Sequence, residues 1–371
     1  MNILSIFDKT NYQPLNAIYI SKDNLVRNYQ YIKSLNPSLE LFPVLKSNAY
    51  GHGILEIGSI VDRFNCKYIC VDSIFEAYQL LKAKVKTPIL IMGYVHPDNL
   101  SIKKLPFSYA VWSEDQVEGI LRHQPKANLH LFVDTGMHRE GVRYDELESF
   151  ANNVDKYKDS FEGIMSHYAS ADDLDSGQNK FQSAEFLRSI EILEKYGFKF
   201  EYKHISATAG ILNNLNDQIN TARLGIGLYG IDPSGQRENL RPVLKLSSTI
   251  VQVKKLRRGE SVGYNATFTA EKDMVLGILP MGYNDGIDRR LSGKGVVKVK
   301  DRYIDFVGRI SMNLSAIDLT DLEDVSVGEE VLIFSDNPDD LNSIEKASEL
   351  CGTIPYDLLV KLNPQIKRLV Y

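Results

Sequence analysis

The sequence predicts an α/β protein: a (β/α)8 TIM-type barrel over residues 1–240, followed by a mostly β domain over residues 241–371. Short apolar runs alternate with helix-period segments along the first two-thirds of the chain, and eight such units in roughly 225 residues fit a barrel. Beyond this region the apolar runs are separated by Gly, Asn and Asp turns, which is typical of antiparallel strands. The length of 371 residues also suits a barrel plus a smaller domain. A doubly wound sheet is the structural alternative.

The barrel elements follow one another in a regular order. The predicted strands are residues 18–20, 41–45, 68–71, 89–92, 109–112, 129–133, 163–167 and 202–205. Helical patterns cover residues 23–35 and 54–64. Ser73 with Glu76 forms a capping-box pattern that begins a helix running to about residue 84, and Ser113 with Gln116 indicates a second capped start. Gly197 is well placed to end the helix before the last strand.

The second domain is expected to consist mostly of strands. We expect strands at residues 244–254, 275–279, 295–300, 303–307, 314–319 and 330–334, and helices only at 343–351 and 356–362. The boundary is expected near residues 235–245, where Asp232-Pro-Ser-Gly235 is a turn-rich linker candidate.

Composition excludes several classes of protein. The chain has 43 Lys and Arg residues and 48 Asp and Glu residues, which gives a net charge of 43 − 48 = −5. Nucleic acid and anionic membranes are therefore poor first guesses for a partner. With 43% apolar and 25% charged residues, the disordered, collagen-like and membrane classes do not fit. The first residues lack the pattern of a signal peptide, and we expect a cytoplasmic protein.

Cysteine usage predicts neither a disulfide framework nor a metal site. Cys66 and Cys70 stand four residues apart, but no second Cys pair or nearby His completes a zinc site, and Cys351 is distant in sequence. We expect three buried or spare thiols in a reducing compartment.

Lys46 is the first candidate for chemistry, because it ends an apolar strand and begins a polar, Gly-flanked loop. Functional residues of barrel enzymes lie at the carboxyl ends of the strands. Desolvation in a barrel mouth favours the neutral form of an amine, which can form a Schiff base. On this stretch alone, a strand-end lysine that reaches along apolar surface into solvent is the alternative.

Seven motifs in order then resemble those of the alanine racemase family, from about residue 16 to the end of the chain. Lys46-Ser-Asn-Ala-Tyr-Gly-His-Gly53 is similar to the family's pyridoxal-phosphate attachment motif. The others are Asp134-Thr-Gly-Met-His-Arg139-Glu-Gly141, Ser166-His167-Tyr-Ala169 with Ala171-Asp172, Arg223-Leu-Gly-Ile-Gly-Leu-Tyr-Gly230, Gly263-Tyr264-Asn-Ala-Thr267, Gly282-Tyr283-Asn-Asp-Gly286 and Thr353-Ile-Pro-Tyr356.

The resemblance implies an amino-acid racemase that interconverts L- and D-alanine on pyridoxal 5'-phosphate and supplies D-alanine for peptidoglycan. It implies a base on each face of the substrate: Lys46 on one face and Tyr264, contributed by the other subunit of a homodimer with shared active sites, on the other. A free tyrosine has a pKa near ~10 and needs activation by its neighbours. His167 is the residue that the resemblance places in hydrogen bonding to that tyrosine.

The resemblance also implies the binding residues. Arg223 is expected to face the pyridine nitrogen and, because a guanidinium holds its proton, to restrain side reactions such as transamination. The phosphate is expected to bind the hydroxyls of Tyr50, Thr208 and Tyr356 and the backbone N–H groups of Gly225 and Ile226, since oriented N–H groups suit an anion. The substrate carboxylate is expected to bind Arg139 and the backbone of Met312; a core gap-filler is the alternative for Met312 alone.

Four positions depart from the family pattern. Phe132 stands where many members have a lysine, carbamylated to hold the arginine. We therefore expect no carbamate here, and Arg139 either has another partner or is held more loosely. Ala207 replaces an asparagine, and Ser311 and Asn313 replace a cysteine and an aspartate. Tyr283 and Tyr356 are kept, and the resemblance implies that tyrosines at these positions narrow the entrance and the pocket in favour of Ala or Ser.

Three alternatives stay open at this point. One is a broader racemase that acts on serine or basic amino acids. A decarboxylase of similar architecture is another, although Arg223 and the motif containing Tyr264 favour a racemase. A non-catalytic cofactor-binding protein is the third, and the β domain that carries Tyr264 argues against it.

Overall fold

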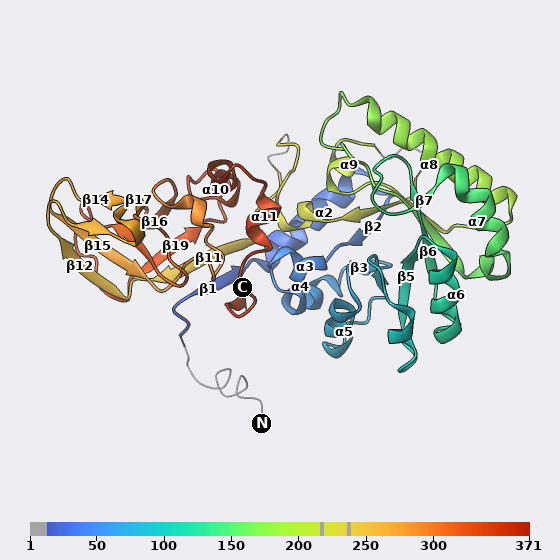
Figure 1. Ribbon diagram of the computed structural model, residues 1–371, viewed down its shortest axis with the longest axis horizontal. Coiled ribbons are helices and arrows are strands. Elements are labelled where there is room, and N and C mark those ends of the chain that lie inside the picture. Colours follow the sequence, from blue (N-terminus) through green and yellow to red (C-terminus); the bar gives the residue numbers. More distant parts are fainter. Residues whose placement is uncertain (1–12, 216–218, 236–238) are drawn as a thin grey trace. The chain divides into compact units, whose positions relative to one another are not determined.

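The computed structural model describes residues 13–215, 219–235 and 239–371, which form two compact units (Figure 1). One unit is Asp23–Leu240. The other joins Arg241–Tyr371 to the N-terminal segment that ends at Lys22. Residues 1–12, most of the segment judged for a signal peptide, lie outside the described residues.

The first unit is built around parallel strands that are buried along most of their length. Burial on both faces is what a parallel sheet covered by helices requires, and it explains the continuous apolar runs. The strands are β2 (Glu40–Pro43), β3 (Ile69–Val71), β4 (Ile89–Ile91), β5 (Phe107–Val111), β6 (Leu129–Asp134), β8 (Phe161–Met165), β9 (Tyr202–His204) and β10 (Thr221–Leu224).

Within the described residues these eight strands close into a ring. Six run in the order β3-β4-β5-β6-β8-β9, and β10 pairs with β2 in parallel. The Arg223 N–H donates to the Ser206 carbonyl (3.0 Å) beyond β9, and the Leu45 N–H donates to the Cys70 carbonyl of β3 (2.8 Å). These bonds join the two sets, so the predicted TIM-type barrel is confirmed.

Helices follow most of the strands, and Figure 1 shows α5 to α8 around them. Both capped starts are confirmed: Ser73 and Glu76 form a full capping box on α5, and Ser113 caps α6. Gly197, with φ of +87°, follows the end of α8 as expected. The helices are α2 (Lys22–Leu35), α3 (Lys46–Tyr50), α4 (Ile54–Val61), α5 (Ile74–Lys82), α6 (Glu114–His123), α7 (Leu147–Asn153), α8 (Gly177–Lys195) and α9 (Thr208–Leu212). Shorter elements are η1 (Pro97–Leu100), β7 (Val142–Arg143), which pairs with β6, η2 (Tyr144–Glu146), η3 (Asp155–Ser160) and η4 (Ile226–Tyr229).

One strand assigned to the barrel lies elsewhere. β1 (Ala17–Ile20), expected as the first barrel strand, pairs instead with β11 (Leu244–Thr249) and β20 (Lys367–Val370) of the other unit. β10 takes the eighth place in the barrel, although its segment was singled out only as a motif. A short apolar strand shows no preference for a particular sheet, because its partners are distant in sequence.

The second unit is mostly β, as expected. Among the described residues its sheet runs β12-β15-β18-β17-β16-β19-β11-β1-β20. The segment 244–254, expected as one strand, is two, β11 and β12 (Gln252–Leu256), and β20 was not anticipated. The remaining elements are β13 (Ser261–Val262), η5 (Tyr264–Ala266), β14 (Phe268–Thr269), β15 (Met274–Leu279), η6 (Arg289–Leu291), β16 (Val296–Val299), β17 (Arg302–Val307), β18 (Ser315–Asp318), β19 (Glu330–Phe334), α10 (Ile344–Cys351) and α11 (Pro355–Leu359).

All three cysteines are buried and free. Burial raises the pKa of the Cys66 and Cys70 thiols to about 12, so both are uncharged at neutral pH. Of the helices in the described parts of the chain, none is both long enough and apolar enough to cross a membrane.

Candidate active site

The predicted site residues of the barrel follow the carboxyl ends of its strands. Lys46 comes after β2, His167 after β8, Thr208 after β9 and Gly225 after β10, while Arg139 follows β6. Parallel strands present their carboxyl ends on one rim of a barrel, which is where barrel enzymes carry their active sites. The fold therefore gathers residues that are up to 179 positions apart (225 − 46) on one rim.

Lys46 opens a turn of unusual handedness, which we call the lysine turn (residues 46–51). The N–H of Ala49 donates to the Leu45 carbonyl (2.9 Å), and that of Gly51 to the Ser47 carbonyl (3.0 Å). The turn is left-handed, and each non-glycine residue in that conformation costs roughly 1–2 kcal/mol. Surrounding contacts must hold such a turn in place. The φ angles are 55° for Ser47, 55° for Asn48, 53° for Ala49, 53° for Tyr50 and 81° for Gly51.

The lysine turn carries Tyr50 to a small cradle beside Gly225. A Cβ added to Gly225 would lie 2.8 Å from the Tyr50 hydroxyl oxygen and 3.9 Å from Thr208 Oγ1, so only glycine leaves this space open. The Thr208 hydroxyl accepts from the Gly227 N–H (3.1 Å) and keeps its own hydrogen to donate. In the described residues the N–H groups of Gly225 and Ile226 have no backbone partner.

The chemistry of these residues fits a phosphate group. The hydroxyl oxygens of Tyr50 and Thr208 lie within 3.9 Å of the position that a Cβ on Gly225 would take, next to two backbone N–H groups, and hydroxyl and N–H groups are the donors that an anion prefers. Tyr50 packs against Tyr229, with ring centroids 5.1 Å apart, and the Tyr229 hydroxyl donates to the Val44 carbonyl (2.9 Å). The cradle is thus supported from the barrel side.

Arg223 is buried in β10, with 4% of its surface exposed. NH1 donates to His204 Nδ1 (2.8 Å) and to the His204 carbonyl (3.0 Å). NH2 donates to the Ser166 carbonyl (2.5 Å), to His167 Nδ1 (3.0 Å) and to the Ile205 carbonyl (3.2 Å). Among the described residues Arg223 Nε has no hydrogen-bond partner, and it is not fully enclosed by protein. Its hydrogen is therefore the one that Arg223 can offer to a ligand. Burial lowers the pKa of Arg223 to about 10, which leaves it a cation at neutral pH.

The tautomer of His167 follows from its partner. A guanidinium only donates hydrogen bonds, so Nδ1 of His167 accepts and Nε2 carries the hydrogen. Burial, followed by the positive charges of Arg223, Arg139 and Lys46, lowers the pKa of His167 to about 3. At neutral pH His167 therefore presents a neutral N–H donor on its far side.

A buried chain of side chains behind Arg223 was not anticipated. His204 Nδ1 accepts from Arg223, so its Nε2–H donates to His130 Nδ1 (2.9 Å), and the His130 Nε2–H donates to the Glu162 carboxylate (3.2 Å). The chain fixes both imidazoles as neutral tautomers, and burial lowers the pKa of each. The only signal in the sequence was a histidine inside each of two short barrel strands. Gly163 makes room for this chain, because a Cβ there would lie 2.1 Å from His130 Nδ1.

Arg139 has an anionic partner, which is one of the two outcomes expected from the departure at Phe132. Its Nε donates to Glu140 Oε2 (2.6 Å), which leaves the terminal fork of the guanidinium for another group. Phe132 packs against Trp112, with ring centroids 6.4 Å apart, and against buried Ala110 and Met165. An apolar cluster thus surrounds the Phe132 side chain.

Three predicted site residues, Tyr264, Met312 and Tyr356, belong to the second unit. Tyr264 lies on the turn between β13 and β14 and is 65% exposed. Gly263 (φ +74°) and Gly308 (φ +68°) hold this turn close to its neighbours, since a Cβ on Gly308 would lie 2.8 Å from the Val262 carbonyl. The tyrosine therefore projects from a fixed turn.

Met312, 55% exposed, lies on a turn that packs against the motif containing Tyr283. The Tyr283 N–H donates to the Ser311 carbonyl (3.0 Å), and the Asn284 N–H donates to the Met312 carbonyl (2.9 Å). Gly282 permits this approach, because a Cβ there would lie 2.1 Å from the Ser311 carbonyl. Two motifs that are separate in the sequence thus form one structure.

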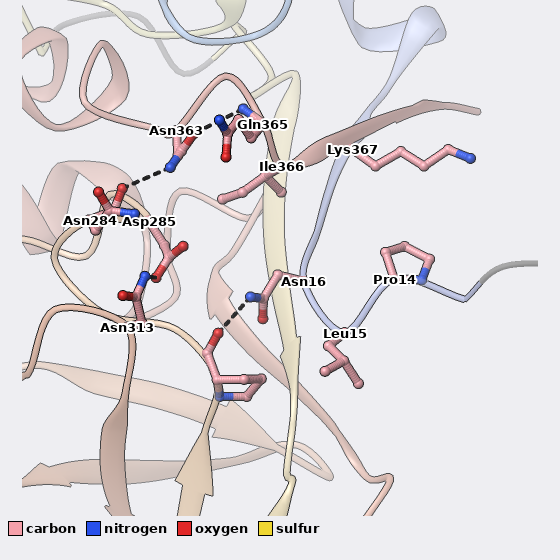
Figure 2. A pocket seen from close by; sticks show the side chains of 11 residues that line it. Pro14, Leu15, Asn16, Asn284, Asp285, Asn313, Asn363, Gln365, Ile366 and Lys367 are labelled. Carbon is pink, nitrogen blue, oxygen red and sulfur yellow. Dashed lines mark hydrogen bonds between the residues drawn. The ribbon is translucent and has the colours of Figure 1, made fainter. Parts of the chain in front are cut away.

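Beside the turns that carry Met312 and Tyr283, the second unit has a hollow of about 370 Å³ with a wall rich in amide side chains (Figure 2). Asn313, one of the departures, donates from Nδ2 to Asp285 Oδ2 (3.4 Å), which also accepts from the Gly282 N–H (2.9 Å). Asn363 Nδ2 donates to the Asn284 carbonyl (3.1 Å). The amides hold the backbone of the turns in this region.

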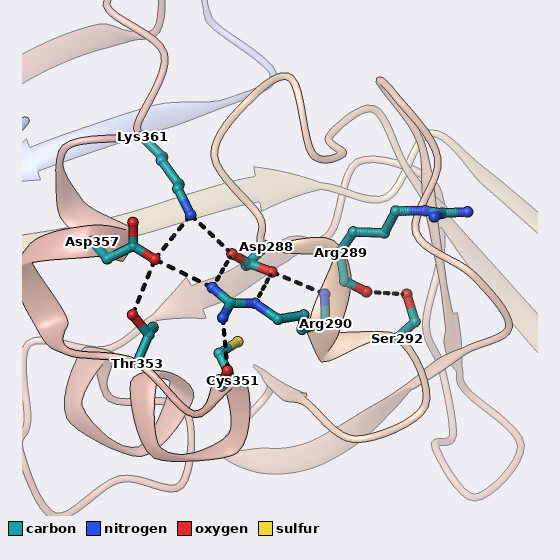
Figure 3. Close-up of polar contacts among 8 residues, drawn as sticks. All are labelled: Asp288, Arg289, Arg290, Ser292, Cys351, Thr353, Asp357 and Lys361. Carbon is teal, nitrogen blue, oxygen red and sulfur yellow. Dashed lines mark hydrogen bonds and ion pairs between the residues drawn. The ribbon is translucent and has the colours of Figure 1, made fainter.

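Tyr356 lies in the first turn of α11, which an ion-pair network anchors (Figure 3). Asp357 accepts from Arg290 NH2 (3.2 Å) and from Lys361 Nζ (2.9 Å), and Asp288 accepts from the same two cations. The hydrogen bonds from Arg290 hold the pKa of Asp288 well below its usual range, although burial opposes this. The helix that carries Tyr356 is therefore fixed to the η6 segment.

Comparison with known proteins agrees with this geometry. Residues 20–233 match the family described as "Alanine racemase, N-terminal domain", and residues 243–370 match "Alanine racemase, C-terminal domain". The alanine racemase of Lactobacillus acidophilus is 32% identical over 374 residues, which cover 96% of this chain and 97% of that protein. The alanine racemase of Clostridium tetani is 33% identical over 94% of this chain and 93% of that protein. The solved alanine racemase of Clostridium difficile is 27% identical, with a TM-score of 0.90 over 97% of both chains. The chain belongs to the alanine racemase family, whose members depend on pyridoxal 5'-phosphate.

Proposed function

We propose that this protein is an alanine racemase that moves the α-proton of alanine between two bases, Lys46 and Tyr264 of the partner subunit. The observation that carries the proposal is the rim of the barrel, which has Lys46 after β2 together with a phosphate cradle, a buried arginine with one unused N–H and a neutral histidine. We also propose that the enzyme is cytoplasmic and supplies D-alanine for peptidoglycan.

The barrel residues would hold and tune the cofactor. Tyr50, Thr208, Gly225 and Ile226 bind its phosphate, and Lys46 anchors it covalently. Bound pyridoxal 5'-phosphate supplies the electron sink that makes the α-proton of an amino acid removable. Arg223 keeps its own proton and offers only Nε–H to the ring nitrogen, so that nitrogen receives a hydrogen bond and no proton.

His167 supports Tyr264 as the second base. Its Nε2–H points away from Arg223 and can donate a hydrogen bond to a phenol oxygen, which would orient the tyrosine toward the substrate. Tyr264 is exposed on a fixed turn of its own subunit, as a residue that completes a neighbour's site must be. The enzyme is therefore expected to be an obligate homodimer that loses activity on dilution.

Arg139 and the Met312 backbone would bind the substrate carboxylate. Because Glu140 occupies Arg139 Nε, the terminal fork remains for a bidentate carboxylate contact. Tyr283 and Tyr356 add bulk to the pocket, so alanine is preferred, with serine next. Basic amino acids are expected to be poor substrates.

The first experiment traps the cofactor by borohydride reduction, maps the modified residue by mass spectrometry, and assays racemisation of L-Ala, L-Ser and L-Lys with and without added cofactor. We expect modification at Lys46 and the highest kcat/KM with alanine. A higher kcat/KM with lysine, or release of CO2 in place of racemisation, would overturn the proposal.

The second experiment tests the two bases. Tyr264→Phe should abolish racemisation and yet still exchange the α-proton of one enantiomer for deuterium in 2H2O, because Lys46 serves one face alone. Tyr303→Phe changes a half-exposed tyrosine of the same unit and is the matched control. Racemisation at the wild-type rate in the Tyr264 variant would contradict the two-base mechanism.

A further inference from the structure

The peptide planes that follow Lys46 have an unusual hydrogen-bond acceptor. The Ser47 N–H donates to Glu76 Oε1 (2.6 Å), and the Asn48 N–H donates to the same oxygen (3.4 Å). Glu76 lies on α5, almost thirty residues further along the chain. These two N–H groups belong to the first two peptide planes after Lys46, so their direction sets the direction in which Lys46 leaves the backbone.

The other oxygen of the same carboxylate holds the loop after β3. Oε2 of Glu76 accepts from the Asp72 N–H (2.9 Å) and from the Ser73 N–H (3.2 Å). One carboxylate thus joins the ends of two neighbouring barrel strands through four backbone N–H groups. On that loop Asp72 Oδ1 lies 3.7 Å from Lys46 Nζ. The Glu76 carboxylate therefore holds the backbone both at Lys46 and at the acidic residue beside its amine.

Capping α5 does not require this arrangement. A capping box uses one side-chain oxygen on the N-cap N–H, and Gln serves as well as Glu. α6 of the same barrel begins with Gln116 at the corresponding position, and a single oxygen, Oε1, accepts from the N–H of Trp112 (2.8 Å), the residue before the N-cap Ser113. The second acceptor oxygen of Glu76 is therefore surplus to the helix and is directed at the lysine turn.

We propose that Glu76 is a positioning residue for Lys46: its carboxylate holds the left-handed lysine turn so that the amine is presented to the cofactor. The four non-glycine residues in that turn would relax toward ordinary backbone conformations without an outside clamp. This inference rests on the proposed role of Lys46 as the attachment residue.

The test compares two variants of one capping box. Glu76→Gln keeps an acceptor for α5 but turns one oxygen into an NH2 donor, so two of the four N–H groups lose their acceptor. Ser73→Ala removes the side-chain cap of the same helix and leaves the Glu76 carboxylate in place. If E76Q does not fold, Glu76→Asp, which keeps the anion but sets it one methylene further from the turn, replaces it with the same expected order of effects.

Three readouts are taken on the full chain stripped of cofactor. They are amide hydrogen exchange at Ser47 and Asn48, the rate of covalent attachment of pyridoxal 5'-phosphate, and the affinity for pyridoxine 5'-phosphate, which has the phosphate but no aldehyde. In E76Q we expect exchange at least about tenfold faster and attachment at least about tenfold slower, because hydrogen bonds to a charged group are lost. We expect the affinity for pyridoxine 5'-phosphate to fall clearly less than attachment slows, because Tyr50 is the one proposed phosphate donor on the lysine turn, whereas Thr208 and Gly225 lie on other elements. In S73A all three should stay near the wild-type values.

The inference is overturned if E76Q and S73A behave alike, or if E76Q weakens binding of pyridoxine 5'-phosphate as much as it slows attachment. Failure of the proposed function looks different: the wild-type protein itself would then be modified at a residue other than Lys46.

Discussion

The barrel should lose stability steeply between pH 6.5 and pH 5.5, because His130, His167 and His204 are neutral in the folded protein. Burial is the main cause of the lowered pKa of each, and the Arg223 charge adds to it. The perturbation is a pH change from 7.5 to 5.5, made on the wild-type protein and on His204→Asn. In the variant, Oδ1 of the asparagine can still accept from Arg223.

The sign follows from proton uptake. In the unfolded chain a histidine takes up a proton near pH 6.5, whereas in the folded barrel His167 does so only near pH 3. The unfolded state therefore binds more protons below pH 6.5, and stability falls as the pH falls. At pH 5.5, one unit below the pKa of a free histidine, the free energy of unfolding is lower by about 1.4 kcal/mol for each histidine that stays neutral in the folded protein. His167 and His204 together give about 3 kcal/mol at pH 5.5, and His130 adds to this in the same direction.

The assay is urea unfolding followed by tryptophan fluorescence. The chain has one tryptophan, Trp112, and it lies in the barrel, so the signal reports that unit. At pH 7.5 we expect H204N to be less stable by about 1–3 kcal/mol, since the His130 acceptor loses its donor. At pH 5.5 this gap should shrink by about 1.4 kcal/mol, because the variant has one titrating histidine fewer. Parallel pH profiles for the two proteins would refute the assignment of His204 as a buried neutral group.

Three further outcomes are expected. Gly225→Ala should lower cofactor affinity at least about tenfold and cost about 1–3 kcal/mol of stability, because its Cβ would lie 2.8 Å from the Tyr50 oxygen; unchanged affinity in a binding titration would remove Tyr50 from the cradle. Glu140→Gln should raise KM for alanine several-fold with little change in kcat, because Arg139 loses its orienting anion; equal steady-state constants would contradict this. Asp288→Asn should destabilise the second unit by about 1–3 kcal/mol, measured by circular dichroism during urea unfolding, because two cations lose a partly buried anion; an unchanged midpoint would show that the network adds no stability.

Much of the fold follows from local patterns. The capping box at Ser73 and the N-cap at Ser113 begin helices where expected, and seven of the eight apolar runs assigned to the barrel are barrel strands. These signals are readable because a helix start or a buried strand depends on residues that are close in sequence. The segments 18–20 and 221–224 were misassigned for the opposite reason: their partners lie more than 200 and about 180 residues away, respectively.

The candidate site divides in the same way. Residue types and motifs identify in advance which side chains are chemically able to act, among them Lys46 at a strand end and Arg223 in a Gly-rich motif, because both signals can be read from neighbouring residues. Which nitrogen of His167 carries the hydrogen, and which carboxylate holds the lysine turn, became visible only in the folded chain. Those roles depend on donors and acceptors supplied by distant strands, since a guanidinium that can only donate sets the tautomer of each imidazole it meets.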